Sequence, residues 1–299
     1  MADSFEKSVK KHDYALKPYD RFLTCLARIL FSRPFKFFIG VDKAPAMVYE
    51  AAIAAQSPSL ATFLCERMSE NPVGEATWED VDKETFARFI EFTYSEDYSV
   101  PGRILKDQLN HQHQEHQEHQ EPVDDYDFGW GNSAAKKKKV VRGPPLQLFD
   151  SLSYDVKPQS KFAGTYESAI TRSSNENLHE DIGDILIIHA SLYALGEKWG
   201  LEELKTLTLS KLHGTLKRVP REEFDIQHIV KLTRFVYSDE NTPDWEDGID
   251  RLRELVCYYN TTVVELSMKN SAFLALIEEG GPFVRDFWKI AAPMIHSTR

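Results

Sequence analysis

Cysteine is scarce in this sequence, which has only three in 299 residues. Cys25, Cys65 and Cys257 lie far apart and form no CxxC pair. This argues against a disulfide framework and favours a reducing compartment. The polar first residues, MADSFEKSVKKHDY, contain no apolar segment of a secretory signal.

Long apolar runs are also absent. No stretch approaches the 18 uninterrupted apolar residues of a membrane span. We therefore expect a soluble intracellular protein of the nucleus, the cytoplasm or both, with no membrane partner.

Positive charge is in deficit, with a formal net charge of -11. Phosphate binding needs a basic face, so this balance argues against a protein devoted to nucleic acid. Catalytic signatures are missing as well: the sequence contains no GxxxxGK[ST], GxGxxG after a strand, HExxH or GxSxG. Cys65 stands beside Glu66, an anion that does not favour a thiolate. We expect no enzyme and no cofactor.

Residues 20–98 form the first globular part, after a flexible N-terminus at 1–19. Apolar residues at helical spacing in YDRFLTCLARILFS predict an amphipathic helix. PFKFFIGVD and PAMVY predict a β-hairpin, and EATWEDV predicts a brief strand. A helix is expected to open at Ser57-Pro58 and another at the N-cap Asp82. The mixture predicts an α+β unit.

The composition changes after this part. Residues 99–180 are low-complexity, then acidic and aromatic, then basic and proline-rich, so we expect a long disordered insertion. From 181 onward the pattern is helical. We divide this part into a helical hairpin at 181–215 and an all-α extension at 216–299.

Three segments resemble the BTB/POZ domain, a small sheet flanked by helical hairpins. The first pattern of that family is filled by Val48, Ile53, Ser57, Pro58 and Leu60. The second pattern is filled by Phe86, Phe89, Tyr94 and Tyr98. Beyond the insertion, LYALGEKWGLEELKTL resembles the closing helical hairpin of the family. The resemblance covers roughly 20–98 and 185–213, and is closest to fungal members with a helical C-terminal tail.

The resemblance implies a cullin-docking site. In BTB adaptors that recruit a cullin scaffold, an apolar-x-Glu step follows the third helix, and Met68-Ser69-Glu70 stand at the matching place. Met68 would enter an apolar pocket on the partner, and Glu70 would accept hydrogen bonds at its rim. The alternative is that Met68 packs on its own core and Glu70 is a solvated surface charge.

The resemblance also implies a homodimer, because the first helix contributes to the dimer interface in many BTB domains. The candidate interface residues are Phe22, Leu23, Leu26 and Leu30. The alternative is that this helix face packs on its own domain.

Two motifs in the insertion bear on function. Four lysines, Lys136, Lys137, Lys138 and Lys139, match a short nuclear-import signal that an import receptor would bind. Four histidines, His111, His113, His116 and His119, are weak metal ligands in a segment without a core to fix them. A solvated charge run and a solvated spacer are the respective alternatives.

Together these features predict a non-enzymatic interaction module that self-associates or binds an adaptor. Its specific form is a substrate adaptor of a cullin ubiquitin ligase. The main alternative is a nuclear scaffold or transcriptional co-regulator that dimerises without cullin. A metal-handling protein based on the histidine-rich insertion is a lesser alternative.

Overall fold

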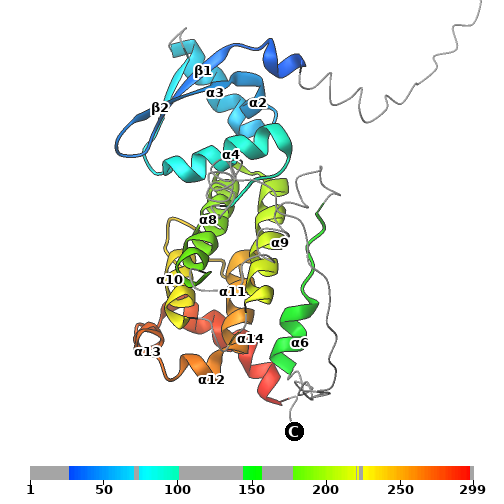
Figure 1. The fold of residues 1–299 in the computed structure, drawn as a ribbon, viewed down its shortest axis with the longest axis vertical. Coiled ribbons are helices and arrows are strands. Elements are labelled where there is room, and N and C mark those ends of the chain that lie inside the picture. The colour runs from blue at the N-terminus through cyan, green and yellow to red at the C-terminus, as the bar shows by residue number, and fades with distance from the viewer. Residues whose placement is uncertain are drawn as a thin grey trace, which may run out of the picture. The chain divides into compact units, whose positions relative to one another are not determined.

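The computed structural model describes most of the chain outside the N-terminus and the central segment; the described residues are 27–70, 74–100, 144–156, 178–219, 221 and 225–296. They belong to two compact units that divide between Asp80 and Val81 (Figure 1). Strands and helices build the first unit, and the described elements of the second are helices. The predicted α+β class is therefore confirmed.

A three-stranded sheet with the order β2-β1-β3 forms the basis of the first unit. β1 (Pro34–Ile39) and β2 (Ala44–Tyr49) form the predicted antiparallel hairpin, and β3 (Glu75–Trp78) runs parallel to β1. Successive side chains of a strand point to opposite faces. The inward face of β1 therefore buries three large apolar side chains: Phe35, Phe37 and Ile39.

Two helices, α2 (Glu50–Ala54) and α3 (Pro58–Glu70), follow the hairpin. The Ser57 hydroxyl accepts a hydrogen bond from the Leu60 amide at 3.1 Å, and Pro58 takes the first helical position, where no amide donor is needed. This confirms the predicted helix start. Leu60 and Leu64 are fully buried and fix the helix to the core of the unit.

Helix α4 (Lys83–Ser95) opens the second unit. As predicted, Asp82 caps it: its Oδ1 accepts hydrogen bonds from the Glu84 and Thr85 amides at 2.9 and 2.8 Å. Three phenylalanines of the helix are buried: Phe86, Phe89 and Phe92. The division after Asp80 thus places α4 in the same unit as the C-terminal helices, although the sequence grouped it with the sheet.

The longest described helices, α8 (Leu178–Trp199) and α9 (Glu202–Arg218), lie side by side (Figure 1). Gly200, at φ 66°, makes the turn between them, and the Leu201 amide donates to the Gly196 carbonyl at 2.8 Å. These two helices and their short turn lie where the sequence predicts a helical hairpin at 181–215, and α8 begins three residues earlier.

Five further helices complete the described part of this unit: α10 (Ile226–Val236), α11 (Arg251–Thr262), α12 (Val264–Ser267), α13 (Ser271–Glu278) and α14 (Gly281–His296). Asp225, Asp250 and Asn270 cap three of them through side-chain acceptors. Their inward faces share one hydrophobic core with α8 and α9. The expected all-α character of the C-terminal extension holds in the described residues.

Helix α6 (Pro144–Ser151) corrects the prediction that residues 99–180 are disordered. Phe149 is fully buried, with its ring centroid 4.8 Å from that of His213 and 5.4 Å from that of Tyr259. Burial of this aromatic ring supplies the apolar contact area that holds the helix against the unit. The prediction is wrong for 144–151, and it stays a prediction for the residues outside the described part.

Candidate functional site

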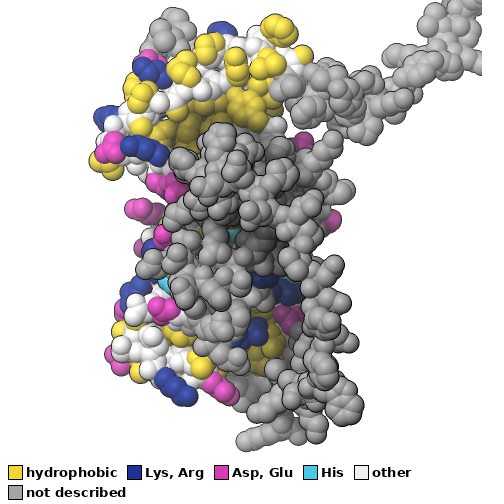
Figure 2. All heavy atoms as spheres, viewed as in Figure 1, with side chains coloured by type: hydrophobic (Ala, Val, Ile, Leu, Met, Phe, Trp, Pro, Cys, Tyr) yellow, Lys and Arg dark blue, Asp and Glu magenta, His cyan; other side chains and the backbone are white. Residues whose placement is uncertain are grey.

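Several large apolar side chains are exposed on the first unit. Four large apolar side chains are at least half exposed: Leu30 (50%), Phe31 (91%), Val41 (88%) and Met47 (63%). We call these four residues the apolar set. Hydrophobic side chains are also seen gathering over this unit in the space-filling view (Figure 2). Exposed large apolar side chains that gather into a patch are typical of protein-binding surfaces.

The strand register explains why Met47 is exposed. Met47 lies opposite Lys36, and Pro45 lies opposite Phe38, so these four side chains share the outward face of the hairpin. The Lys36 ammonium lies 4.6 Å from the centroid of the Phe38 ring and 4.0 Å from the Glu75 carboxylate. The face is therefore mainly apolar and carries one cation that is already paired within the unit.

Met68, the candidate for cullin docking, is half-buried near the end of α3. A Cβ atom at Gly74 would lie 3.5 Å from Met68 Cγ and only 2.9 Å from Phe35 Cδ2. Gly74 also has a φ of 63°, so glycine is required where the chain passes between these two side chains. One side of Met68 thus packs on its own unit and another faces solvent. The Glu70 side chain lies outside the described part.

Most of the other predicted site residues also fall outside the described residues. They are Phe22, Leu23, Leu26, His111, His113, His116, His119, Lys136, Lys137, Lys138 and Lys139. Their roles stay predictions. Leu30 is the member of the dimer set that the structure describes, and its exposure is compatible with an interface. Among the described residues, no group of three or more His, Cys, Asp and Glu side chains could hold a metal ion.

A buried polar cluster joins the end of α4 to α8 and α9. The Tyr98 hydroxyl lies 2.6 Å from His189 Nδ1, and the Lys211 ammonium pairs with Asp97 and also donates to the Tyr98 carbonyl. Burial, helped by Lys211, lowers the pKa of His189 to about 3, so the imidazole is neutral at physiological pH. The cluster fastens helices that the sequence separates by about 90 positions.

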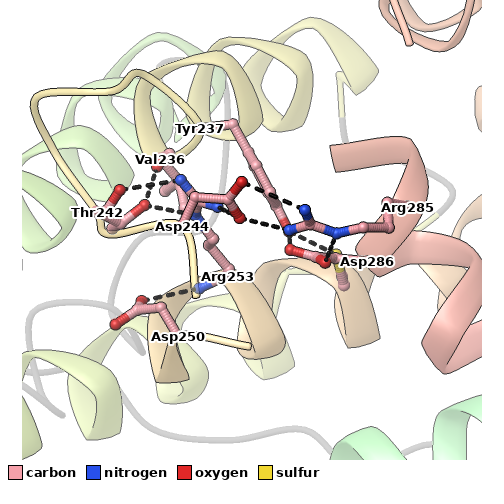
Figure 3. Close-up of polar contacts among 9 residues, drawn as sticks. Val236, Tyr237, Thr242, Asp244, Asp250, Arg253, Arg285 and Asp286 are labelled. Carbon is pink, nitrogen blue, oxygen red and sulfur yellow. Dashed lines mark hydrogen bonds and ion pairs between the residues drawn. The ribbon is translucent and has the colours of Figure 1, made fainter. Parts of the chain in front are cut away.

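A second polar network lies where α10, α11 and α14 meet (Figure 3). Arg253 is almost fully buried, and its guanidinium donates to the Thr242 hydroxyl at 2.7 Å, the Thr242 carbonyl at 2.9 Å and Asp244 at 2.9 Å. Asp244 also pairs with Arg285 of α14. These two guanidinium groups, with Arg285 as the stronger influence, lower the pKa of Asp244. The network fixes the loop at 237–250 to α11 through Arg253 and to α14 through Arg285.

Cys257 and Tyr237 extend this network into the core. The Tyr237 hydroxyl lies 3.1 Å from Cys257 Sγ and donates to Asp286 at 3.3 Å. Burial raises the pKa of the Cys257 thiol to about 12, and burial and Cys257 together raise the pKa of Tyr237. Both groups are therefore protonated at neutral pH, and the arrangement provides hydrogen bonds rather than an activated nucleophile.

Sequence reasoning missed Phe31, Met47 and Arg253. The alternation in PAMVY predicts that Met47 and Val48 face opposite ways, but it does not say which of them faces solvent. Arg253 stands in RLRELV, where a charged residue is ordinarily read as exposed. Its partners, Thr242 and Asp244, lie in a loop, and no local sequence pattern predicts the conformation of that loop.

No family model matches the chain, and neither a curated protein nor a solved structure matches it. The resemblance to the BTB/POZ domain therefore stays a prediction. No helix in the described part of the chain is both long and apolar enough to cross a lipid bilayer.

Proposed function

We propose that this protein is a non-enzymatic protein–protein interaction module of the BTB type. The observation that carries the proposal is the exposure of the apolar set on the first unit, with Phe31 at 91% and Met47 at 63%. The order of elements supports it. A hairpin, two helices, a short strand and a helix, with a helical pair beyond α6, follow the order that the resemblance implies.

The first partner we propose is a second copy of the chain. Full burial of a large apolar side chain contributes about 1.5–3 kcal/mol relative to exposure, so covering Phe31 and Met47 would favour association. The exposed part of Leu30 would extend the same apolar contribution. An interface between two identical copies is commonly symmetric, and the same residues then contribute from both copies.

Sedimentation velocity over a range of concentrations tests this proposal. The wild-type chain should shift from monomer to dimer as concentration rises, and the Phe31→Ser, Met47→Ser double variant should need at least tenfold more protein for the same shift. The matched control is Met268→Ser, which removes a methionine of similar exposure (52%) from the other unit. Equal association of both variants would place the interface elsewhere.

The more specific proposal is that the module is a cullin adaptor. The half-buried Met68 leaves part of its side chain available near the end of α3, where a partner pocket could receive it. Titration with the N-terminal domain of a BTB-binding cullin should give saturable binding. The Met68→Asp, Glu70→Lys variant should lose it while keeping its circular dichroism spectrum.

One observation favours the alternative of a scaffold that dimerises without cullin. Met68 already packs beside Gly74, as a core residue would. Under this alternative the folded wild-type chain binds no cullin but still self-associates, and the lysines at 136–139 direct it to the nucleus. The titration and the sedimentation experiment together separate the two proposals.

A further inference from the structure

Two exposed tryptophans in the second unit lie close in sequence to the Asp244–Arg285 ion pair. Trp245 follows Asp244 in the loop at 237–250, and Trp288 lies three residues after Arg285 on α14. Residues three apart share a helix face, so Arg285 and Trp288 are neighbours on α14. Each tryptophan is 53% exposed. We call Trp245, Trp288 and the ion pair the tryptophan surface.

Tryptophan and arginine dominate the energetics of protein interfaces, and tryptophan carries a large apolar area. Burying the exposed half of two indole rings would contribute substantially to binding. Neither ring belongs to the hydrophobic core of the unit, which other side chains form. The tryptophan surface therefore has the composition of a binding site.

The loop that carries Trp245 is fixed before any partner binds. Arg253 makes three hydrogen bonds to Thr242 and Asp244, and the Asn241 amide group donates to the Phe235 carbonyl at 2.7 Å. The Thr242 hydroxyl also donates to the Val236 carbonyl. A fixed loop loses little conformational entropy on binding, which raises the affinity that a given contact can give.

The charge of the loop indicates what kind of partner fits. Residues 238–249 contain five carboxylates and no lysine or arginine. Arg253 and Arg285 neutralise Asp244. The other four are exposed and form no ion pair with any cation in the described part of the chain: Asp239, Glu240, Glu246 and Asp247. The loop that carries Trp245 therefore holds four exposed carboxylates that have no ion-pair partner among the described residues.

We propose that the tryptophan surface binds a basic segment of another polypeptide. A lysine or arginine of that segment would stack on the Trp245 ring, and further cations would face Glu246 and Asp247. Cation–π contact and opposite charge favour the same partner, whereas an acidic peptide or a phosphate group would be repelled. This function is separate from the apolar set on the first unit.

Fluorescence anisotropy tests the proposal with a labelled peptide of about ten residues that alternates lysine and alanine, titrated with the full chain near physiological salt. We expect saturable binding that Trp245→Ala weakens at least fivefold. Glu246→Lys combined with Asp247→Lys should weaken it more than tenfold. A peptide with glutamate in place of lysine should not bind.

Two control variants separate a specific surface from general charge attraction. Met268→Ala removes another exposed apolar side chain, and Glu265→Lys with Glu278→Lys gives the same change of net charge at exposed positions elsewhere in the unit. Both should bind like wild type. Equal loss in the Glu265, Glu278 control, or no loss in Trp245→Ala, would overturn the proposal. Binding that appears only after replacement of Lys136–Lys139 by alanine would make the chain's own segment the occupant and would also overturn it.

Discussion

At the scale of single residues, the second unit keeps several ionisable side chains away from water by giving each a partner. Lys211 is the clearest case, since burial lowers its pKa while the ion pair with Asp97 acts against that effect. Breaking such a pair by removing one partner is far more damaging than replacing both, because the remaining charge is left buried and alone. His189 avoids this penalty by being neutral.

The buried His189 makes stability depend on pH. Its pKa is about 3 in the folded chain and near 6.5 in the unfolded chain, so the unfolded state binds more protons between these values. Stability is therefore fully present above pH 6.5 and is lost as pH falls through this window, by about 2 kcal/mol between pH 8 and 5. His189→Gln, which keeps a hydrogen-bond acceptor for Tyr98, should remove that part of the pH slope in urea unfolding. An unchanged slope would mean that His189 is not the group responsible.

Arg253 provides a second prediction for a single side chain. Arg253→Met should lower the free energy of unfolding by about 3 kcal/mol, because it removes both donors from the buried Thr242 and leaves Asp244 with Arg285 alone. The matched control is Arg234→Met, which removes an exposed pair with Glu279. An exposed pair contributes less than about 1 kcal/mol. Guanidinium unfolding measures both, and similar losses for the two variants would show that the network around Arg253 is not a fixed structure.

At the scale of elements, α6 is the segment whose packing is least expected from its surroundings. Phe149 inserts between His213 and Tyr259, and the His213 Nε2 lies 2.9 Å from the Phe149 carbonyl. An eight-residue helix is too short to be stable by itself in water, so its packing on α11 must hold it.

Phe149→Ala should therefore destabilise the second unit by about 3–5 kcal/mol, the usual cost of removing a buried aromatic ring. Leu148→Ala, on the same helix but 43% exposed, is the control and should cost less than about 1 kcal/mol. Urea unfolding compares the two. If Phe149→Ala is as mild as the control, α6 does not belong to the folded core in solution.

The elements differ in how far the sequence predicts them. The hairpin, β3 and the helix starts at Ser57-Pro58 and Asp82 follow from local alternation and capping, and the structure confirms them. Helix α6 does not follow from local patterns, because its stability comes from contacts with α11 rather than from its own eight residues. The Arg253 network is unpredictable for the same reason, since it joins a loop and two helices through partners far apart in the chain.

The candidate site was predicted less completely than the fold. The resemblance directed attention to Met68 and Leu30, and both prove to be partly accessible. It did not indicate Phe31 or Met47. The exposure of Met47 depends on which face of the hairpin is buried, and local spacing leaves that open.

At the scale of the whole molecule, we propose two binding functions, and each uses a surface of different chemistry. The apolar set of the first unit suits a second copy of the chain, and the tryptophan surface of the second unit suits a basic segment.

The most direct test of self-association through the apolar set is methionine oxidation by dilute peroxide, read by mass spectrometry at several protein concentrations. Met47 (63% exposed) and Met268 (52%) start with similar access to solvent. We predict that oxidation of Met47 slows at least threefold as concentration rises, while oxidation of Met268 keeps a constant rate. If Met47 is oxidised at the same rate at every concentration, the apolar set is not covered by a second copy, and the central proposal is contradicted.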